Sequence, residues 1–229
     1  MSTAIEWPVL LTVRGKTIPK TLEEMRGLHN QTAGSAPGIA AARALGDLSH
    51  KVFSPNLRMK QSGAAEGELL FLDVWVRPQG IFEFFSNEQV IQQGTKLFSS
   101  RDATVWMRAE GSFSYSLPAP MGKSERLVGM VRGPIASPER AIEIFRGVDQ
   151  KAQPDARKRG LLSHEIFIKL RPPGDESPLE LLGLDHWCDS NGMLEHYADQ
   201  TQMAALASAF SGPPQPSAWE QAPGDWSEW

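Results

Sequence analysis

The stretch ARALGDLSHKVF at residues 42–53 occurs a second time, with changes, as ARKRGLLSHEIF at residues 156–167. Seven of the twelve aligned pairs are identical, whereas ordinary residue usage would give about one by chance. The two segments lie 114 positions apart in a chain of 229 residues. The match therefore predicts an internal duplication, in which each half of the chain builds the same module.

Two further matches occur in the same order along the chain. LFLDVW at residues 70–75 corresponds to LGLDHW at residues 182–187, and VRG at residues 13–15 recurs at residues 131–133. Their offsets, 112 and 118 residues, differ little from 114, as expected when insertions fall in loops. The copies also differ, because the second has His186 and His196 where the first has Val74 and Phe84. One copy could therefore carry a site that the other has lost.

Composition indicates an ordinary globular protein, with 41% hydrophobic and 22% charged residues. The net charge of −4 and the lack of a basic stripe argue against a nucleic-acid partner. The single cysteine, Cys188, rules out a disulfide within the chain. We see neither a secretory signal nor an apolar run of about 20 residues that could span a membrane. We therefore expect a cytoplasmic protein.

Each copy reads as β-α-β-β-α-β. Thr21 and Glu24 form a capping box, and Ser137 before Pro138 marks the matching helix start. The second helices are expected over residues 80–97 and 192–210. Strands are expected at residues 9–14, 48–53, 68–76 and 103–108, and again at residues 127–132, 162–170, 179–188 and 217–221. The predicted domains are a first repeat at residues 8–111, a linker at 112–123, and a second repeat at 124–229 that includes a tail rich in Trp and Pro.

The third strand of each copy carries an acidic residue and a tryptophan on one face. Side chains alternate between the two faces of a strand, and the even-numbered side chains of residues 70–76 are all apolar. We expect this apolar stripe to pack against the helices. The odd-numbered face would then point away from the helices into a shared interior. It carries Phe71, Asp73 and Trp75 in the first copy, and Asp185 and Trp187 in the second.

A carboxylate in an apolar interior has a raised pKa or a partner, which makes Asp73 and Asp185 candidate catalytic residues. The plainer alternative is that backbone N–H groups or Arg14 and Arg132 satisfy them. The predicted substrate-binding set is Trp75, Trp187, Phe71, Arg14 and Arg132.

His50 and His164 are further catalytic candidates, since an imidazole can act as a base near neutral pH or bind a metal. Each shares its parity with an apolar neighbour, Val52 or Ile166, which places it on the helix side unless a bulge intervenes. The alternative is a histidine that only caps a strand end or binds a nearby carboxylate.

The LSH-x-V/I-F segments and the LDxW strand, which a glycine and an aromatic helix follow, resemble the dimeric α/β-barrel superfamily of antibiotic biosynthesis monooxygenase-like and stress-responsive barrel proteins. The resemblance implies an α+β fold of two ferredoxin-like βαββαβ repeats, whose antiparallel sheets pack face to face as a pseudo-dimeric barrel. It also implies that residues of strands two and three facing the interior bind and convert a small molecule. Such a chain is a monomer with an internal barrel, or a homodimer.

We compared three functions. The first is an enzyme that converts a small, largely apolar organic molecule by acid/base chemistry. Its reaction would be an oxygenation that needs no cofactor, or a related isomerisation or elimination. The second is an enzyme that binds haem or a metal ion through His164 or His50; spacing alone predicts no metal site. The third is a non-catalytic protein that binds a small molecule.

Overall fold

The chain divides into two compact units. The computed structural model describes residues 8–59, 63–116 and 126–229, so the expected linker lies outside it from residue 117 onward. Unit 1 is formed by the described residues of Met1–Pro55, Ala65–Met107 and Gln221–Trp229. Unit 2 is formed by those of Asn56–Ala64 and Arg108–Glu220.

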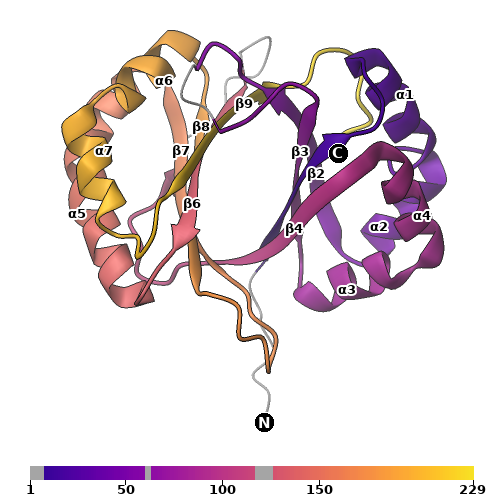
Figure 1. Ribbon diagram of the computed structural model, residues 1–229, viewed down its shortest axis with the longest axis horizontal. Helices are drawn as coiled ribbons and strands as arrows, with labels where there is room; N and C mark the ends of the chain where they lie inside the picture. The colour runs from indigo at the N-terminus through magenta and orange to yellow at the C-terminus, as the bar shows by residue number, and fades with distance from the viewer. Residues whose placement is uncertain (1–7, 60–62, 117–125) are drawn as a thin grey trace. The chain divides into compact units, whose positions relative to one another are not determined.

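Unit 1 is an antiparallel sheet with helices on one face (Figure 1). Its strand order is β4-β1-β3-β2, the ferredoxin-like order. The strands are β1 (Val9–Thr17), β2 (Asp47–Pro55), β3 (Glu68–Trp75) and β4 (Phe98–Arg108). The helices are α1 (Leu22–Gln31), α2 (Ala36–Ala44), α3 (Pro78–Ser86) and α4 (Glu88–Leu97).

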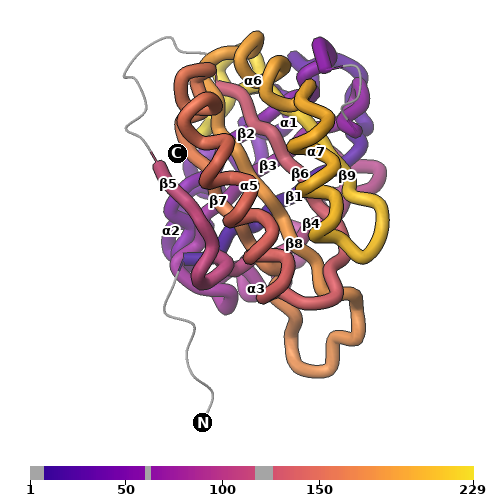
Figure 2. Tube along the Cα trace, turned by 90° about the vertical axis from the view of Figure 1, so that its left-hand side faces the viewer, coloured from indigo at the N-terminus to yellow at the C-terminus, as the bar shows by residue number. Residues whose placement is uncertain are grey.

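Unit 2 repeats this arrangement, with the order β9-β6-β8-β7 and the short β5 at the outer edge of β7. Figure 2 shows α5 and α7 lying along the sheet of this unit. The strands are β5 (Tyr115–Ser116), β6 (Leu127–Pro134), β7 (Leu161–Lys169), β8 (Glu180–Trp187) and β9 (Gln215–Gln221). The helices are α5 (Pro138–Lys158), α6 (Ser190–Tyr197) and α7 (Gln200–Ala207). The predicted α+β class is thus confirmed.

Strand register is the same in the two units. Asp73 of β3 lies between Leu11 and His50 on the neighbouring strands, and Asp185 of β8 lies between Gly129 and His164. Each unit also has a β-bulge three to five residues before Val52 or Ile166, one between Asp47 and Ser49 and the other between Leu161 and Ser163. The shared register supports the predicted duplication.

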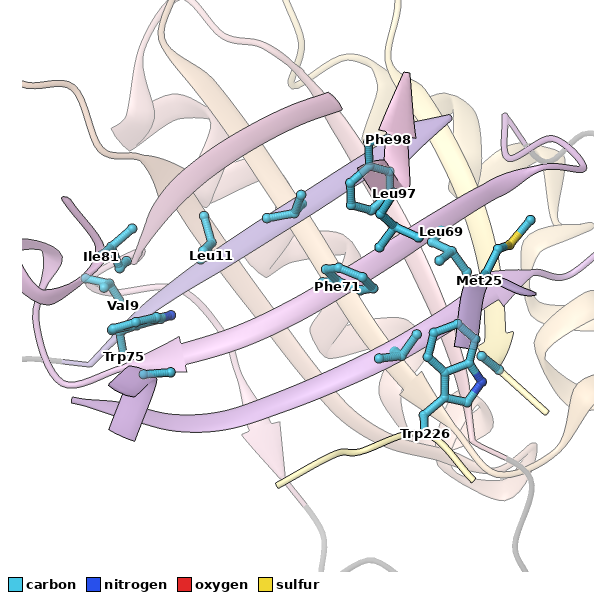
Figure 3. Packing of buried hydrophobic residues seen from close by; sticks show 14 residues of the cluster. Val9, Leu11, Met25, Leu69, Phe71, Trp75, Ile81, Leu97, Phe98 and Trp226 are labelled. Carbon is cyan, nitrogen blue, oxygen red and sulfur yellow. The ribbon is translucent and has the colours of Figure 1, made fainter. Parts of the chain in front are cut away.

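The expected facing of the third strand is wrong. Figure 3 shows Phe71 and Trp75 of β3 on the same side as Val9 and Leu11 of β1, packed with Ile81 of α3. The odd-numbered side chains therefore face the helices. The even-numbered ones face away, so apolar character did not distinguish the two faces: seven of the eight residues of β3 are buried.

Each second helix is broken in two where the sequence predicted one. Asn87 ends α3 and caps α4, its side chain accepting from the N–H of Gln89. Asp199 begins α7 by accepting from the N–H groups of Thr201 and Gln202. Short polar side chains favour such caps over helix interiors. Among the described residues, none of the helices is long and apolar enough to cross a membrane.

The last residues of the chain, Gln221–Trp229, belong to unit 1. The backbones of Trp229 and His50 are paired by two N–H···O bonds of 2.8 and 3.3 Å, and the N–H of Ala222 donates to the carbonyl of Val52. Trp226 is 9% exposed and packs in the core cluster with Met25. The end of the chain thus docks along β2 and helps to close the unit 1 core.

Candidate functional site

A histidine and an aspartate pair on the helix side of the sheet in both units. His50 Nδ1 lies 2.5 Å from Asp73 Oδ1, and His164 Nδ1 lies 2.6 Å from Asp185 Oδ1. Because each pair sits directly opposite on neighbouring strands, both members must point to the same face. The prediction that the histidines face the helices is confirmed. The aspartates join them there instead of facing the opposite side.

In unit 1 the network is complete. Asn30 Oδ1 accepts from the N–H of Ser227, so His29 Nδ1, 2.9 Å from the same oxygen, is its donor. Neutral His29 then accepts at Nε2 from His50 Nε2, 2.9 Å away. His50 therefore donates from both nitrogens, the other bond going to Asp73. Trp229 stacks on the His50 ring with 4.7 Å between ring centroids.

In unit 2 the corresponding imidazole, that of His164, lies between two carboxylates. Its Nε2 atom is 2.9 Å from Asp149 Oδ2 on α5, an ion-pair distance. The N–H is not aligned with this oxygen, and among the described residues neither atom has a hydrogen-bond partner. The side chains of His164 and Asp149 are only 8% and 10% exposed. These two buried atoms thus satisfy each other's charge.

Asp185 has a second hydrogen-bond partner besides His164. The hydroxyl of Tyr197 on α6 donates to Asp185 Oδ2 at 2.6 Å, and Trp187 Nε1 lies 3.3 Å from that hydroxyl. Both oxygens of Asp185 therefore accept short hydrogen bonds. A carboxylate satisfied in this way is held ionised and is a poor proton acceptor.

The pKa values of the cluster diverge. Burial favours a neutral imidazole, but the carboxylates of Asp185 and Asp149 outweigh it and raise the pKa of His164 to about 10. Burial also raises the pKa of Asp149, although His164 partly offsets it. The pKa of Asp185 is lowered, because His164 and the Tyr197 hydrogen bond overcome the effect of burial. The pKa of His164 thus favours an imidazolium at neutral pH, and Asp149 is the carboxyl of the cluster whose pKa is raised.

This cluster lines a cavity of about 220 Å³ that lies wholly within unit 2, between the sheet and α5, α6 and α7. Its walls are largely apolar, with Phe113, Phe145, Phe210 and several methionines. The hydroxyl of Tyr115, from β5, is also buried there and has no hydrogen-bond partner among residues 8–59, 63–116 and 126–229. Apolar walls with a few convergent polar groups are typical of small-molecule sites.

Two glycines of unit 2 stand where unit 1 has large side chains. Gly183 lines the cavity at the register position of Phe71, and Gly129 stands at that of Leu11. A Cβ atom on Gly183 would lie 3.4 Å from the ring of Phe145. A Cβ on Gly129 would collide with the Tyr197 hydroxyl. The sheet side of the unit 2 site is therefore free of the two side chains that fill unit 1.

Other residues of the predicted site lie elsewhere. Trp75 and Trp187 are 1% and 0% exposed in the core clusters, and Phe71 packs edge-on against His50. Arg14 and Arg132 pair with Glu68 and Glu180, at 2.7 and 2.6 Å, and not with the aspartates. His196 lines the cavity, whereas His186 bonds to Ser163 at 3.0 Å.

Sequence reasoning did not identify Asp149, Tyr115 or Tyr197 as site residues. Each is a single polar residue within an amphipathic helix or within the expected linker, with no motif around it. One usable signal was the contrast between copies, because Gly183 and Gly129 interrupt otherwise matching strands.

Comparison with known proteins identifies the fold. Neither a protein-family model nor a curated protein matches the sequence. Among solved structures, an anthrone oxidase-like protein is 13% identical with a TM-score of 0.63, covering 94% of this chain and 91% of that one. A candidate monooxygenase from Fusobacterium nucleatum subsp. nucleatum is 9% identical with a TM-score of 0.59, covering 97% and 94%.

A chlorite dismutase variant from Candidatus Nitrospira defluvii is 13% identical with a TM-score of 0.51, covering 94% of this chain and 91% of that one. At such identities the likeness concerns the fold alone. The chain shares the fold of these solved structures.

Haem, the cofactor of our second hypothesis, does not fit the unit 2 site. Carboxylates face both ring nitrogens of His164, so neither nitrogen is free to ligate iron. The cavity is also smaller than the roughly 300–1,000 Å³ that drug-sized ligands fill. Within the described ranges, no group of three or more His, Cys, Asp or Glu side chains is arranged to hold a metal ion.

Proposed function

We propose that unit 2 is the active site of an enzyme that converts a small, largely apolar organic molecule by acid/base chemistry. The observation that carries this proposal is the His164 imidazolium, buried between two carboxylates in the wall of an apolar cavity. The predicted closure of the two repeats into a pseudo-dimeric barrel remains part of the proposal.

Asp149 is the proton acceptor in this mechanism. Its side chain lines the cavity, and its raised pKa brings it closer to the working pH of a general base. His164, held protonated, stabilises the negative charge that develops on the substrate. The Tyr115 hydroxyl is a second donor for that charge. Asp185 orients His164 and does not itself accept the proton.

The substrate loses a proton from a weakly acidic C–H or O–H group and becomes an anion. This anion has three possible fates: reaction with dioxygen, protonation at another atom, or expulsion of a leaving group. They correspond to oxygenation, isomerisation and elimination, and product analysis distinguishes them.

The test begins with the ligand that purified protein retains, identified by native mass spectrometry. Exchange of its acidic proton in D₂O is then followed by NMR. We expect Asp149→Asn to slow exchange about a hundredfold or more, the usual range for a general base. Asp155→Asn is the matched control, because Asp155 lies on the same helix with a side chain that is 71% exposed. Unchanged exchange in Asp149→Asn would reject the mechanism, and tight binding with no exchange in wild type would indicate a binding protein.

A further inference from the structure

Tyr197 contacts the cluster from the side opposite to Asp149. Its hydroxyl donates to Asp185 Oδ2 at 2.6 Å, while Asp185 Oδ1 accepts a hydrogen bond from His164 Nδ1. Two hydrogen bonds through Asp185 therefore link the Tyr197 hydroxyl to the His164 ring, whose other nitrogen faces Asp149.

Gly129 makes this position possible. It lies beside Asp185 in the sheet, and the nearest atoms to a Cβ built on it are the hydroxyl, Cε2 and Cζ of Tyr197. Unit 1 has Leu11 at the same register position, beside Asp73. The residue of unit 1 that corresponds to Tyr197 at an offset of 112 is Phe85, which has no hydroxyl. The glycine and the tyrosine thus occur together in one copy and are both replaced in the other.

We infer that Tyr197 is a positioning residue of the unit 2 site: its hydroxyl, admitted by Gly129, keeps Asp185 a carboxylate and so keeps His164 an imidazolium. This inference rests on the proposed function and names a part that the mechanism did not require. The reason is charge balance. A carboxylate that loses a short hydrogen bond from a buried donor binds a proton more readily and stabilises a neighbouring cation less.

Several titratable groups surround Asp185. They are His164 on β7, Asp149 on α5, Tyr197 and His196 on α6, and Tyr115 on β5. Burial keeps His196 neutral by lowering its pKa, and the pKa of both tyrosines is raised. Asp149 and His164 are thus the groups whose protonation responds when Tyr197 is changed.

The test is an NMR pH titration of the histidine side chains, which needs no substrate. The His164 resonance is assigned by its loss in His164→Gln. In Tyr197→Phe we expect the pKa of His164 to fall by about one to two units, the effect of one lost hydrogen bond to a charged group. Gly129→Ala should produce a fall of the same sign, because the added methyl group displaces the hydroxyl from Asp185.

Tyr115→Phe is the matched control. It removes a hydroxyl from the same cavity, but that hydroxyl has no hydrogen-bond partner in the described part of the chain, so the pKa of His164 should stay as in wild type. An unchanged pKa in Tyr197→Phe, or an equal fall in Tyr115→Phe, would overturn the inference. If Tyr197→Phe does not fold, Gly129→Ala decides the question alone. Loss of proton exchange in Asp149→Asn with no titration change in these variants would reject this inference and leave the proposed function standing.

Discussion

A single imidazole can serve as structure or as chemistry, depending on what faces its second nitrogen. In unit 1 that nitrogen donates to neutral His29, whose pKa burial and the charge on His50 lower to about 4. Every member of that chain has a partner, so His50 is fixed. In unit 2 the second nitrogen forms an ion pair with the carboxylate of Asp149 at 2.9 Å. The duplicated Asp–His pair thus continues to a neutral histidine in one copy and to a second carboxylate in the other.

Asp47 provides a residue-scale test of burial. It is 5% exposed, and burial together with Asp73 raises its pKa to about 7. A raised carboxyl pKa means that the folded state binds the proton more tightly, so stability is lost as pH rises from about 4 toward 7. Asp47→Asn removes this loss while the amide oxygen still accepts from the N–H of Ser49.

We therefore expect Asp47→Asn to raise the free energy of unfolding by about 1–3 kcal/mol at pH 8.5. The gain should vanish near pH 3.5, where the carboxyl is protonated in both states. Urea unfolding at the two pH values measures this. Equal stability of variant and wild type at pH 8.5 would show that Asp47 is not perturbed in the fold.

The sequence predicted Asp73, Asp185, His50 and His164 as candidate catalytic residues, but it placed the two aspartates on the wrong face of the sheet. The alternation rule assigns residues to two faces and does not say which face meets the helices when both are buried. The pairing of His50 with Asp73 would have settled it, since opposite residues share a face. That pairing is a tertiary fact, as is the approach of Asp149 from α5, and neither is visible along the chain.

At the scale of elements, two glycines let the helix after the third strand pack closely. A Cβ atom on Gly80 would collide with the backbone carbonyl of Leu45, and one on Gly192 with that of Arg159. Both glycines lie in the first turn of a helix, α3 or α6. Backbone cannot move aside as a side chain can, so either glycine is needed for its helix to approach.

We expect Gly192→Ala to lower the free energy of unfolding by about 1–3 kcal/mol, the range of an overpacked core. Gly147→Ala is the matched control, because Gly147 lies in α5 with nothing within 4 Å of an added Cβ. Alanine there should stabilise by about 0.5–1 kcal/mol through helix propensity. Denaturant unfolding of both variants measures the contrast, and a destabilisation no larger than that of a surface change would argue against close packing at Gly192.

Strands and helix starts were predictable because their signals are local. β-branched runs, the Thr21 capping box and Ser137 before Pro138 all mark the elements that the structure shows. The breaks at Asn87 and Asp199 were missed, because a polar residue inside an amphipathic pattern reads equally well as an exposed helical position. Only the packing of the following turn selects the cap.

At the scale of the whole molecule, the chain's last residues complete its first unit. Asn30 on α1 binds this C-terminal segment through both ends of its side-chain amide. Its Nδ2 atom donates to the carbonyl of Asp225, and its Oδ1 atom accepts from the N–H of Ser227. Glu228 accepts from the N–H of Val52 on β2. The place of these last residues in the unit 1 core depends on contacts between residues about 180 or more positions apart in sequence.

Trp226 tests whether this docking stabilises unit 1. Its indole is buried against Met25 and lies 5.3 Å from the His29 ring between centroids. Trp226→Ala should therefore lower the free energy of unfolding by about 3–5 kcal/mol, as for a large aromatic in a core. Phe82→Ala, at a position on α3 that is 51% exposed, should change it by no more than about 0.5 kcal/mol. Trp226→Ala should also raise the pKa of His29 from about 4 toward 6.5, because water reaches the histidine ring. Urea unfolding and histidine NMR measure the two effects, and a tail that merely rests on the surface would produce neither.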